Sequence, residues 1–285
     1  MHHREAMIEL KQFEFEKIKH LIYTKFGINL TQEKFALVEA RLIKTLIEQN
    51  MNSFNEFYNW VTEDKTNRGL SLLIDKISTN HTYFYRENEH FLYILDHFQE
   101  FLKLANQDEQ NELRIWSAGC SYGDEPYTYA IILHDFLEKN NFPFRFKILA
   151  TDINQDAIKN AEIGIYDEAR LSYLPKYLRL KYFLKQEDGL YQIKETIKQF
   201  VLFRRLNFMN ETFPFKKQFH IISCRNVMIY FDQKTKDTLL NKFHRLLNPK
   251  GVLFIGHSES ITSSNSMFKI IQPAIFKPLP MGSLL

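Results

Sequence analysis

The chain has 285 residues, of which 45% are hydrophobic and 15% aromatic, and its formal net charge is +3. This length fits one large domain or two smaller ones, and the charge is too small to indicate broad nucleic-acid binding. The cysteines Cys120 and Cys224 imply no disulfide framework and favour a reducing compartment. The first eleven residues are too charged for a signal peptide, and no apolar run is long enough to cross a bilayer. We therefore expect a soluble cytoplasmic protein without membrane insertion.

The first quarter of the chain has the patterns of helices. Apolar residues recur at helical spacing from Phe15 to Phe26, and Gly27 suits the end of that helix. A second helix is predicted over 34–49, a third through Phe54 to Trp60 and a fourth over 69–77. We therefore expect an all-helical N-terminal domain over residues 1–76.

Three basic residues of the second predicted helix, Lys34, Arg41 and Lys44, lie on a different side from its apolar stripe. A solvated charged face is one interpretation of this pattern. The other is a basic patch that meets an acidic partner. The sequence leaves both interpretations open.

Residues 77–90 connect the helical segment to the rest of the chain and are dense in hydrogen-bonding side chains. Loops that carry such groups often carry function. His81 and His90 are not at metal-ligand spacing with any cluster of Cys or Asp, so we treat them as structural or exposed and predict no metal site. One helix is predicted to follow, over 91–104.

The segment 113–137 reads as a strand, a turn of small residues and a helix. Gly119 and Gly123 bracket the turn, and Asp124, Glu125 and Pro126 open the helix. Proline suits the first helical turn, and acidic residues there suit the helix dipole. This order is the opening unit of a nucleotide-binding βαβ fold.

The sequence argues against a pyrophosphate as the ligand of this unit. Neither G-x-G-x-x-G nor G-x-x-x-x-G-K-[ST] is present, and Glu125 would repel a phosphate. A carboxylate there suits a cationic or hydroxyl-rich ligand such as S-adenosylmethionine. The next strand, 146–152, ends in Asp152, and an acid at that position commonly accepts ribose hydroxyls. An ordinary βαβ unit with solvated acids remains the alternative.

The remaining segments predict the rest of a doubly wound sheet. Strands at 190–193 and 200–203, with a turn at Asp188-Gly189, predict a small antiparallel insertion over about 173–203. The main fold resumes at Arg204 with a buried strand over 219–224, a helix over 234–247 and a strand over 252–256. Segments 268–271 and 274–277 are close enough to pair as a terminal antiparallel hairpin. We expect a Rossmann-like α/β sheet of the class I methyltransferase type.

Two other activities find little support in the sequence. Residues 256–260, Gly-His-Ser-Glu-Ser, lack the second glycine of a nucleophile elbow, which argues against a hydrolase. Residues 226–230 lack the Asn-Pro-Pro-Tyr form that methylation of amines tends to use. The polar strand ends predicted to surround one crevice are the stretch 119–125, Asp152, Asn207, Arg225 and Asn226.

Five ordered motifs resemble the chemotaxis receptor methyltransferase family, CheR. They are 79–87 (Thr-Asn-His-Thr-Tyr-Phe-Tyr-Arg-Glu), 118–127 (Ala-Gly-Cys-Ser-Tyr-Gly-Asp-Glu-Pro-Tyr), 150–153 (Ala-Thr-Asp-Ile), 224–231 (Cys-Arg-Asn-Val-Met-Ile-Tyr-Phe) and 256–259 (Gly-His-Ser-Glu). The resemblance covers almost the whole chain. It implies S-adenosylmethionine-dependent methylation of glutamate side chains on methyl-accepting chemotaxis receptors, with S-adenosylhomocysteine as the product.

The resemblance also implies roles for individual residues. Glu125 would hold the amino-acid end of the cofactor and Asp152 its ribose. The linker 77–90 and the other strand ends would supply the remaining cofactor contacts, from Asn80, Thr82, Arg86, Gly119, Asn207, Phe208, Arg225 and Asn226. The cofactor domain would span 91–285. One departure is Asp124, where the family usually has Glu.

Three residues are candidates for the reaction itself. Tyr230 would lie near the transferred methyl group, and Arg86 and Arg225 would orient a carboxylate. A structural salt bridge is the alternative for each arginine. A glutamate carboxylate is already a nucleophile at neutral pH, so no general base is required.

Two alternatives to the receptor methyltransferase stay open. One is a methyltransferase of the same fold that acts on small molecules or RNA, and the other is a non-enzymatic S-adenosylmethionine-binding receptor module. The helical domain with Lys34, Arg41 and Lys44 argues against a small-molecule substrate and would meet the cytoplasmic helical domain of the receptor. Intact Glu125, Asp152 and Tyr230 argue against an inactive protein. We expect a monomer.

Overall fold

The computed structural model describes residues 8–107, 111–261 and 267–280. The chain divides into two compact units. The helical unit comprises residues 1–79 together with Asn207–Met209 and Tyr230–Asp232. The sheet unit comprises Asn80–Leu206, Asn210–Ile229 and residues 233–285. The helical pattern of the sequence led us to expect a boundary between residues 76 and 77, followed by a linker to residue 90. In the structure, residues 80–90 of this linker belong to the sheet unit.

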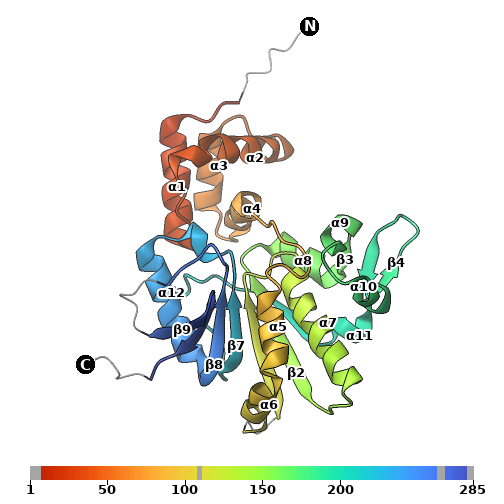
Figure 1. The fold of residues 1–285 in the computed structure, drawn as a ribbon. Coiled ribbons are helices and arrows are strands. Elements are labelled where there is room, and N and C mark those ends of the chain that lie inside the picture. Colours follow the sequence, from red (N-terminus) through yellow and green to blue (C-terminus); the bar gives the residue numbers. More distant parts are fainter. Residues whose placement is uncertain (1–7, 108–110, 262–266, 281–285) are drawn as a thin grey trace. The chain divides into compact units, whose positions relative to one another are not determined.

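The helical unit is built from the predicted helices, α1 Gln12–Phe26, α2 Phe35–Glu48, α3 Phe54–Glu63 and α4 Arg68–Ile77, with a short 3-10 turn η1 Gln32–Lys34 before α2 (Figure 1). The apolar stripes meet in a core in which Phe15, Ile22, Leu42 and Phe57 are fully buried. The Ser53 side chain begins α3 by accepting a hydrogen bond from the Glu56 amide at 3.1 Å, as expected for an N-cap.

Two short segments from late in the sequence belong to the helical unit through bonds to the end of α1 and to the residues that follow it. The Asn207 side chain donates to the Lys25 carbonyl at 2.8 Å, and the Asn29 amide donates to the Tyr230 carbonyl at 2.8 Å. The Tyr23 hydroxyl donates to an Asp232 carboxylate oxygen at 2.6 Å. These bonds join residues that are about two hundred positions apart in the chain, as the Tyr23–Asp232 separation of 209 shows.

The sheet unit contains a seven-stranded sheet in the order β6-β2-β1-β7-β8-β10-β9. The first five strands in this order are parallel, and β9 and β10 add an antiparallel hairpin at one edge. This confirms the predicted methyltransferase version of the doubly wound fold. The strands are β1 Glu112–Ala118, β2 Arg145–Asp152, β6 Val201–Arg205, β7 Phe219–Cys224, β8 Leu247–Ile255, β9 Phe268–Gln272 and β10 Ile275–Pro278.

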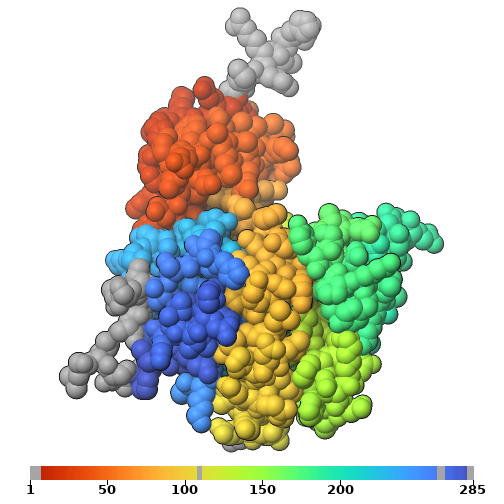
Figure 2. Space-filling model, in the orientation of Figure 1, coloured from red at the N-terminus to blue at the C-terminus, as the bar shows by residue number. Residues whose placement is uncertain are grey.

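Helices pack on this sheet, with α7 against β2 and β6, and α12 against β8. One predicted helix, over 91–104, is two, since α5 ends at Asp96 and α6 begins at Phe98. The His97 ring stacks on Tyr93 at this break. Residues of α5 and α6 (yellow) cover the middle of one face of the sheet unit in Figure 2. The larger helices are α5 Glu89–Asp96, α6 Phe98–Asn106, α7 Asp124–Lys139, α8 Gln155–Ile163 and α12 Gln233–Leu246.

A second, three-stranded antiparallel sheet forms the insertion, in the order β3-β5-β4. The prediction of a small antiparallel insertion is confirmed, but the prediction of which strands belong to it is wrong in part. The segment 200–203 does not join it: β6 pairs in parallel with β2 in the main sheet. The reason is apolar burial, because Phe200 stacks on Phe146 of β2 and Phe203 is buried. The insertion contains β3 Ile165–Tyr166, α9 Glu168–Leu171, α10 Lys176–Tyr182, β4 Phe183–Lys185, β5 Tyr191–Ile193 and α11 Glu195–Lys198.

The strand register brings the carboxyl ends of the central strands together. Ala118 of β1 pairs with Thr151 of β2, and Ser117 pairs with Ser223 of β7. Ligands of such sheets bind beyond the carboxyl ends, where the strand order reverses between β1 and β7. Within the described residues, no helix combines the length and apolar character needed to cross a membrane.

Candidate active site

The turn after β1 runs close to the turn after β7. Gly119 has φ 95° and its amide donates to the Thr151 carbonyl at 2.7 Å. A Cβ at this position would lie 2.3 Å from a methyl carbon of Val227, so any larger residue would force the two turns apart. The absence of a side chain here therefore has a packing reason beyond the unusual backbone angle.

Asp152 stands at the end of β2 with its carboxylate fixed by the backbone. One oxygen accepts the Ser121 amide at 2.7 Å and the other accepts the Asn154 amide at 2.9 Å. Burial raises the pKa of Asp152, although these amides act in the opposite direction. Each carboxylate oxygen can accept more than one hydrogen bond, so the group retains capacity for hydroxyl donors.

Glu125, in the first turn of α7, is held between two neighbouring strands. One carboxylate oxygen accepts the Ser117 hydroxyl of β1 at 2.7 Å, and the other pairs with the Arg225 guanidinium at 3.2 Å. Burial raises the pKa of Glu125, while Arg225 opposes that rise. Glu125 is therefore a nearly buried acid that forms an ion pair with an arginine at the end of β7.

Arg225 is the centre of the polar cluster at this edge. Its side chain is 3% exposed and pairs with both Glu87 and Glu125 at 3.2 Å. It also donates to the Arg86 carbonyl and lies over the Phe91 ring. Burial alone would lower the pKa of Arg225, but the carboxylates reverse that effect and raise it. A guanidinium stays charged in proteins, so one buried cation is balanced by two acids.

The linker residues reach this edge through Glu87. Its carboxylate accepts the Asn226 side-chain amide at 3.3 Å and the His257 backbone amide at 3.4 Å, in addition to pairing with Arg225. Although burial would raise the pKa of Glu87, Arg225 and these donors lower it. Glu87 lies in the motif 79–87, but we predicted no role for it. The sequence around a single acid beside Arg86 does not indicate which residue that acid would pair with.

Three linker residues were predicted to contact the cofactor. The Asn80 carbonyl accepts the Ser121 hydroxyl at 3.3 Å, which places Asn80 beside the turn after β1. The Arg86 side chain turns back to the His81 carbonyl at 2.9 Å and lies over the Tyr83 ring. Thr82 is half-buried in the same segment. The contacts predicted for these three residues with a cofactor stay predictions.

Asp124, the departure from the family pattern, has a structural partner. It is fully buried and forms a two-bond ion pair with Arg170 of α9. Burial raises the pKa of Asp124, and Arg170 counteracts this. The pair joins the start of α7 to the insertion, so Asp124 acts in the packing of the sheet unit.

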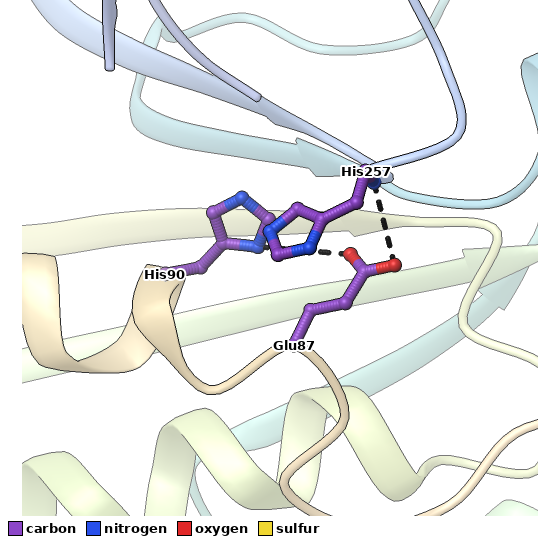
Figure 3. A group of neighbouring side chains, drawn as sticks. All are labelled: Glu87, His90 and His257. Atoms are coloured by element: carbon purple, nitrogen blue, oxygen red, sulfur yellow. Dashed lines mark hydrogen bonds and ion pairs between the residues drawn. The ribbon is translucent and has the colours of Figure 1, made fainter. Parts of the chain in front are cut away.

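Glu87, His90 and His257 form a group that could hold a metal ion, with ligand atoms within 4.8 Å of one another (Figure 3). We did not predict this group from the sequence, because His257 is far from Glu87 and His90 along the chain. His90 is buried and stacked on Phe254. Its Nδ1 lies 4.0 Å from a Glu87 carboxylate oxygen, which is too far for a hydrogen bond, and neither ring nitrogen is hydrogen-bonded. Burial, and then the charge of Arg225, lower the pKa of His90 to about 2, so the ring is neutral. The Arg225 guanidinium on the Glu87 carboxylate would repel a cation, and we assign the group no metal.

Asn207, Phe208 and Tyr230 fall in the helical unit. The Asn207 side-chain oxygen accepts the Met209 amide at 2.9 Å, and its amide binds the Lys25 carbonyl. Tyr230 is half-buried and its carbonyl is bonded to Asn29. The cofactor and substrate roles assigned to these three residues stay predictions.

The three basic residues proposed as a partner surface differ in their surroundings. Lys34 and Lys44 are exposed, Lys34 at the end of η1 and Lys44 on α2. Arg41 is half-buried and donates to three carbonyls at the end of α4, with the shortest bond, 2.6 Å, to Ile77. The sequence indicated one basic face, but the structure shows that Arg41 is engaged within the helical unit.

Comparisons with known proteins identify the family. A model described as "CheR methyltransferase, SAM binding domain" matches residues 80–276, and one described as "CheR methyltransferase, all-alpha domain" matches residues 14–78. A chemotaxis protein methyltransferase of Borreliella burgdorferi is 45% identical over 272 residues, covering 95% of each chain. One of Escherichia coli is 33% identical, covering 92% of this chain and 90% of its own. The chain therefore belongs to the CheR methyltransferase family and uses S-adenosylmethionine.

Proposed function

We propose that this protein transfers the methyl group of S-adenosylmethionine to glutamate carboxylates on the cytoplasmic helical domain of methyl-accepting chemotaxis receptors. The relatives named chemotaxis protein methyltransferase support a role in chemotaxis. The observation that carries the proposal is the convergence of Asp152, Glu125 and Arg225 at the carboxyl edge of a methyltransferase sheet. The product on the receptor would be a glutamate methyl ester.

Each of these residues has a role that fits its surroundings. Asp152 would accept the ribose hydroxyls of the cofactor, because its carboxylate is fixed by amides and still has acceptor capacity. Glu125 would face the methionine ammonium, where its charge compensates a cation. Arg225 and Asn226 would orient the amino-acid end, while the small turn at Gly119 lets the cofactor approach the backbone.

The chemistry needs little acid–base help from the protein. The bound cofactor supplies an activated methyl on a sulfonium centre. The receptor carboxylate has a reference pKa of about 4.3 and is already ionised at neutral pH. The residues of the site would hold the two reactants in line and exclude water, and such positioning can supply a large part of a rate enhancement. Arg86 and Tyr230 are proposed to help position the carboxylate and the methyl group respectively.

The test is transfer of labelled methyl to membranes that contain chemoreceptors, followed by treatment with alkali. Glutamate methyl esters release methanol under alkali, whereas methylated amines and RNA bases do not. Base-labile label on the receptor band is the expected result. Stable label would instead indicate the same fold acting on another substrate. Binding of S-adenosylhomocysteine without any transfer would indicate a non-enzymatic receptor module.

A further inference from the structure

The segment Gly256-His-Ser-Glu259 after β8 contains a carboxylate that the proposed function does not use. Glu259 accepts four backbone amides, two on each oxygen. One oxygen takes Asn226 at 2.9 Å and Gly256 at 2.6 Å. The other takes Val227 at 3.0 Å and Ile229 at 3.2 Å. Both lone pairs of each oxygen are thus directed at the backbone.

Three of these amides belong to the turn that follows β7, immediately after Arg225. Successive backbone amides around a left-handed residue form a concave anion site. Asn226 has φ 59°, in the left-handed region that Asn adopts more readily than other residues with a side chain. Glu259 occupies this concavity from within the protein. Its carboxylate therefore gives an acceptor to amides of the turn that would otherwise point at their surroundings without one.

The turn and the Glu259 segment are also fitted closely to each other. A Cβ at Gly256 would lie 2.5 Å from the Asn226 side-chain nitrogen and 2.9 Å from its backbone nitrogen. Only a residue without a side chain allows this approach. The segment 256–260, which resembles a nucleophile elbow in sequence, therefore has a different role. Its glycine allows the close approach to the turn, and its acid accepts the amides of the turn.

The residues that this turn presents are those proposed to bind the cofactor. The Arg225 guanidinium is directed at Glu125 and Glu87, and the Asn226 side-chain amide at Glu87. The direction of both side chains depends on the backbone between β7 and Ile229. That backbone is fixed by Glu259 at three of its amides.

We propose that Glu259 is a positioning residue of the cofactor site, whose carboxylate holds the turn after β7 in the shape that presents Arg225 and Asn226. The inference rests on the proposed cofactor roles of those two residues. Burial raises the pKa of Glu259, because it removes the carboxylate from water. The backbone amides that donate to the carboxylate oppose that rise. Glu259 acts through the turn and does not itself contact the cofactor.

Calorimetric titration with S-adenosylhomocysteine tests the proposal. In Glu259→Gln an NH2 group would face two amides that need an acceptor, so we expect a loss of affinity of at least tenfold. Asp167→Asn is the matched control, because Asp167 is an exposed carboxylate that accepts a backbone amide, that of Arg170 in the insertion. Its affinity should equal that of the wild type. A folded Glu259→Gln protein that binds within twofold of the wild type would overturn the proposal.

Chemical rescue separates positioning from general destabilisation. Glu259→Ala leaves the anion site without its carboxylate, and formate or acetate in the buffer should restore affinity for S-adenosylhomocysteine at least severalfold. The same anions should not rescue Glu259→Gln, whose amide fills the space. A purely structural role would lower the unfolding temperature of both variants and leave the affinity of the folded protein unchanged, which contradicts the proposal.

Two further outcomes remain informative. If Glu259→Gln does not fold, Glu259→Asp decides the question: we expect reduced affinity with a raised KM for S-adenosylmethionine, and unchanged values would reject the inference. If the wild type binds S-adenosylhomocysteine but methylates no receptor, the proposed receptor function fails. The inference on Glu259 would then still be judged by the binding data alone.

Discussion

Asp152 shows how a single residue can be both buried and available for binding. Its two oxygens are fixed by the Ser121 and Asn154 amides, and it occupies a strand end that faces the ligand side of the sheet. We expect Asp152→Ala to weaken binding of S-adenosylhomocysteine by roughly 1.5–3 kcal/mol, as for a hydrogen bond to a charged group. Calorimetry measures this directly. Asp156→Ala, an exposed acid on α8, is the control and should bind normally.

Asp152 also supports the backbone through the Ser121 and Asn154 amides. Asp152→Asn keeps one carbonyl acceptor of the same size and should lose less affinity than the alanine variant. Equal affinity of wild type and Asp152→Ala would remove Asp152 from the cofactor site.

At the scale of elements, the C-terminal end of α4 depends on a side chain from α2. Arg41 donates to the carbonyls of Lys76, Ile77 and Ser78, which a helix end leaves without intrahelical partners. We expect Arg41→Ala to lower the free energy of unfolding of the helical unit by about 1–2 kcal/mol. Denaturant titration followed by circular dichroism measures the change. Lys44→Ala, an exposed neighbour on the same helix, should change stability by less than about 0.5 kcal/mol.

The two exposed lysines provide a cleaner test of a partner surface than Arg41 does. Lys34→Glu combined with Lys44→Glu should slow receptor methylation severalfold and leave affinity for S-adenosylhomocysteine unchanged. The defect should shrink at high salt, because exposed charges are screened. Methylation rates at low and high ionic strength measure the effect. A normal rate at low salt would mean that these lysines are merely solvated.

At the scale of the whole molecule, the neutral His90 makes folding depend on pH. In the unfolded chain His90 has a pKa near 6.5, whereas in the folded protein it is lowered to about 2. Between these values the unfolded state binds the additional proton, so stability falls as the pH is lowered below 6.5, by about 1.4 kcal/mol per pH unit. His90→Leu should flatten this dependence between pH 7 and 5. Parallel pH profiles of the unfolding free energy for the two proteins would contradict the prediction.

The sequence alone predicted the fold class because local patterns carry it. Helical spacing in the first quarter, the strand–turn–helix unit at 113–137 and the paired terminal segments correspond to elements of the structure. Asp152 and Glu125 could be singled out because each stands at the boundary of an element, where parallel sheets bind ligands. The motifs then identified the cofactor, which the family match confirmed.

What only the tertiary structure decided is which side chains meet. Glu87 and Arg225 are 138 residues apart, and Asn226 and Glu259 are 33 apart, so no local periodicity encodes either contact. The same holds for β6, whose short apolar segment suits either sheet until Phe200 and Phe203 are seen to cover β2. Arg41 looked like part of a charged face because sequence spacing gives its direction on the helix and not its neighbours. Burial and long-range hydrogen bonding are properties of the packed chain, and they determined the use of each of these residues.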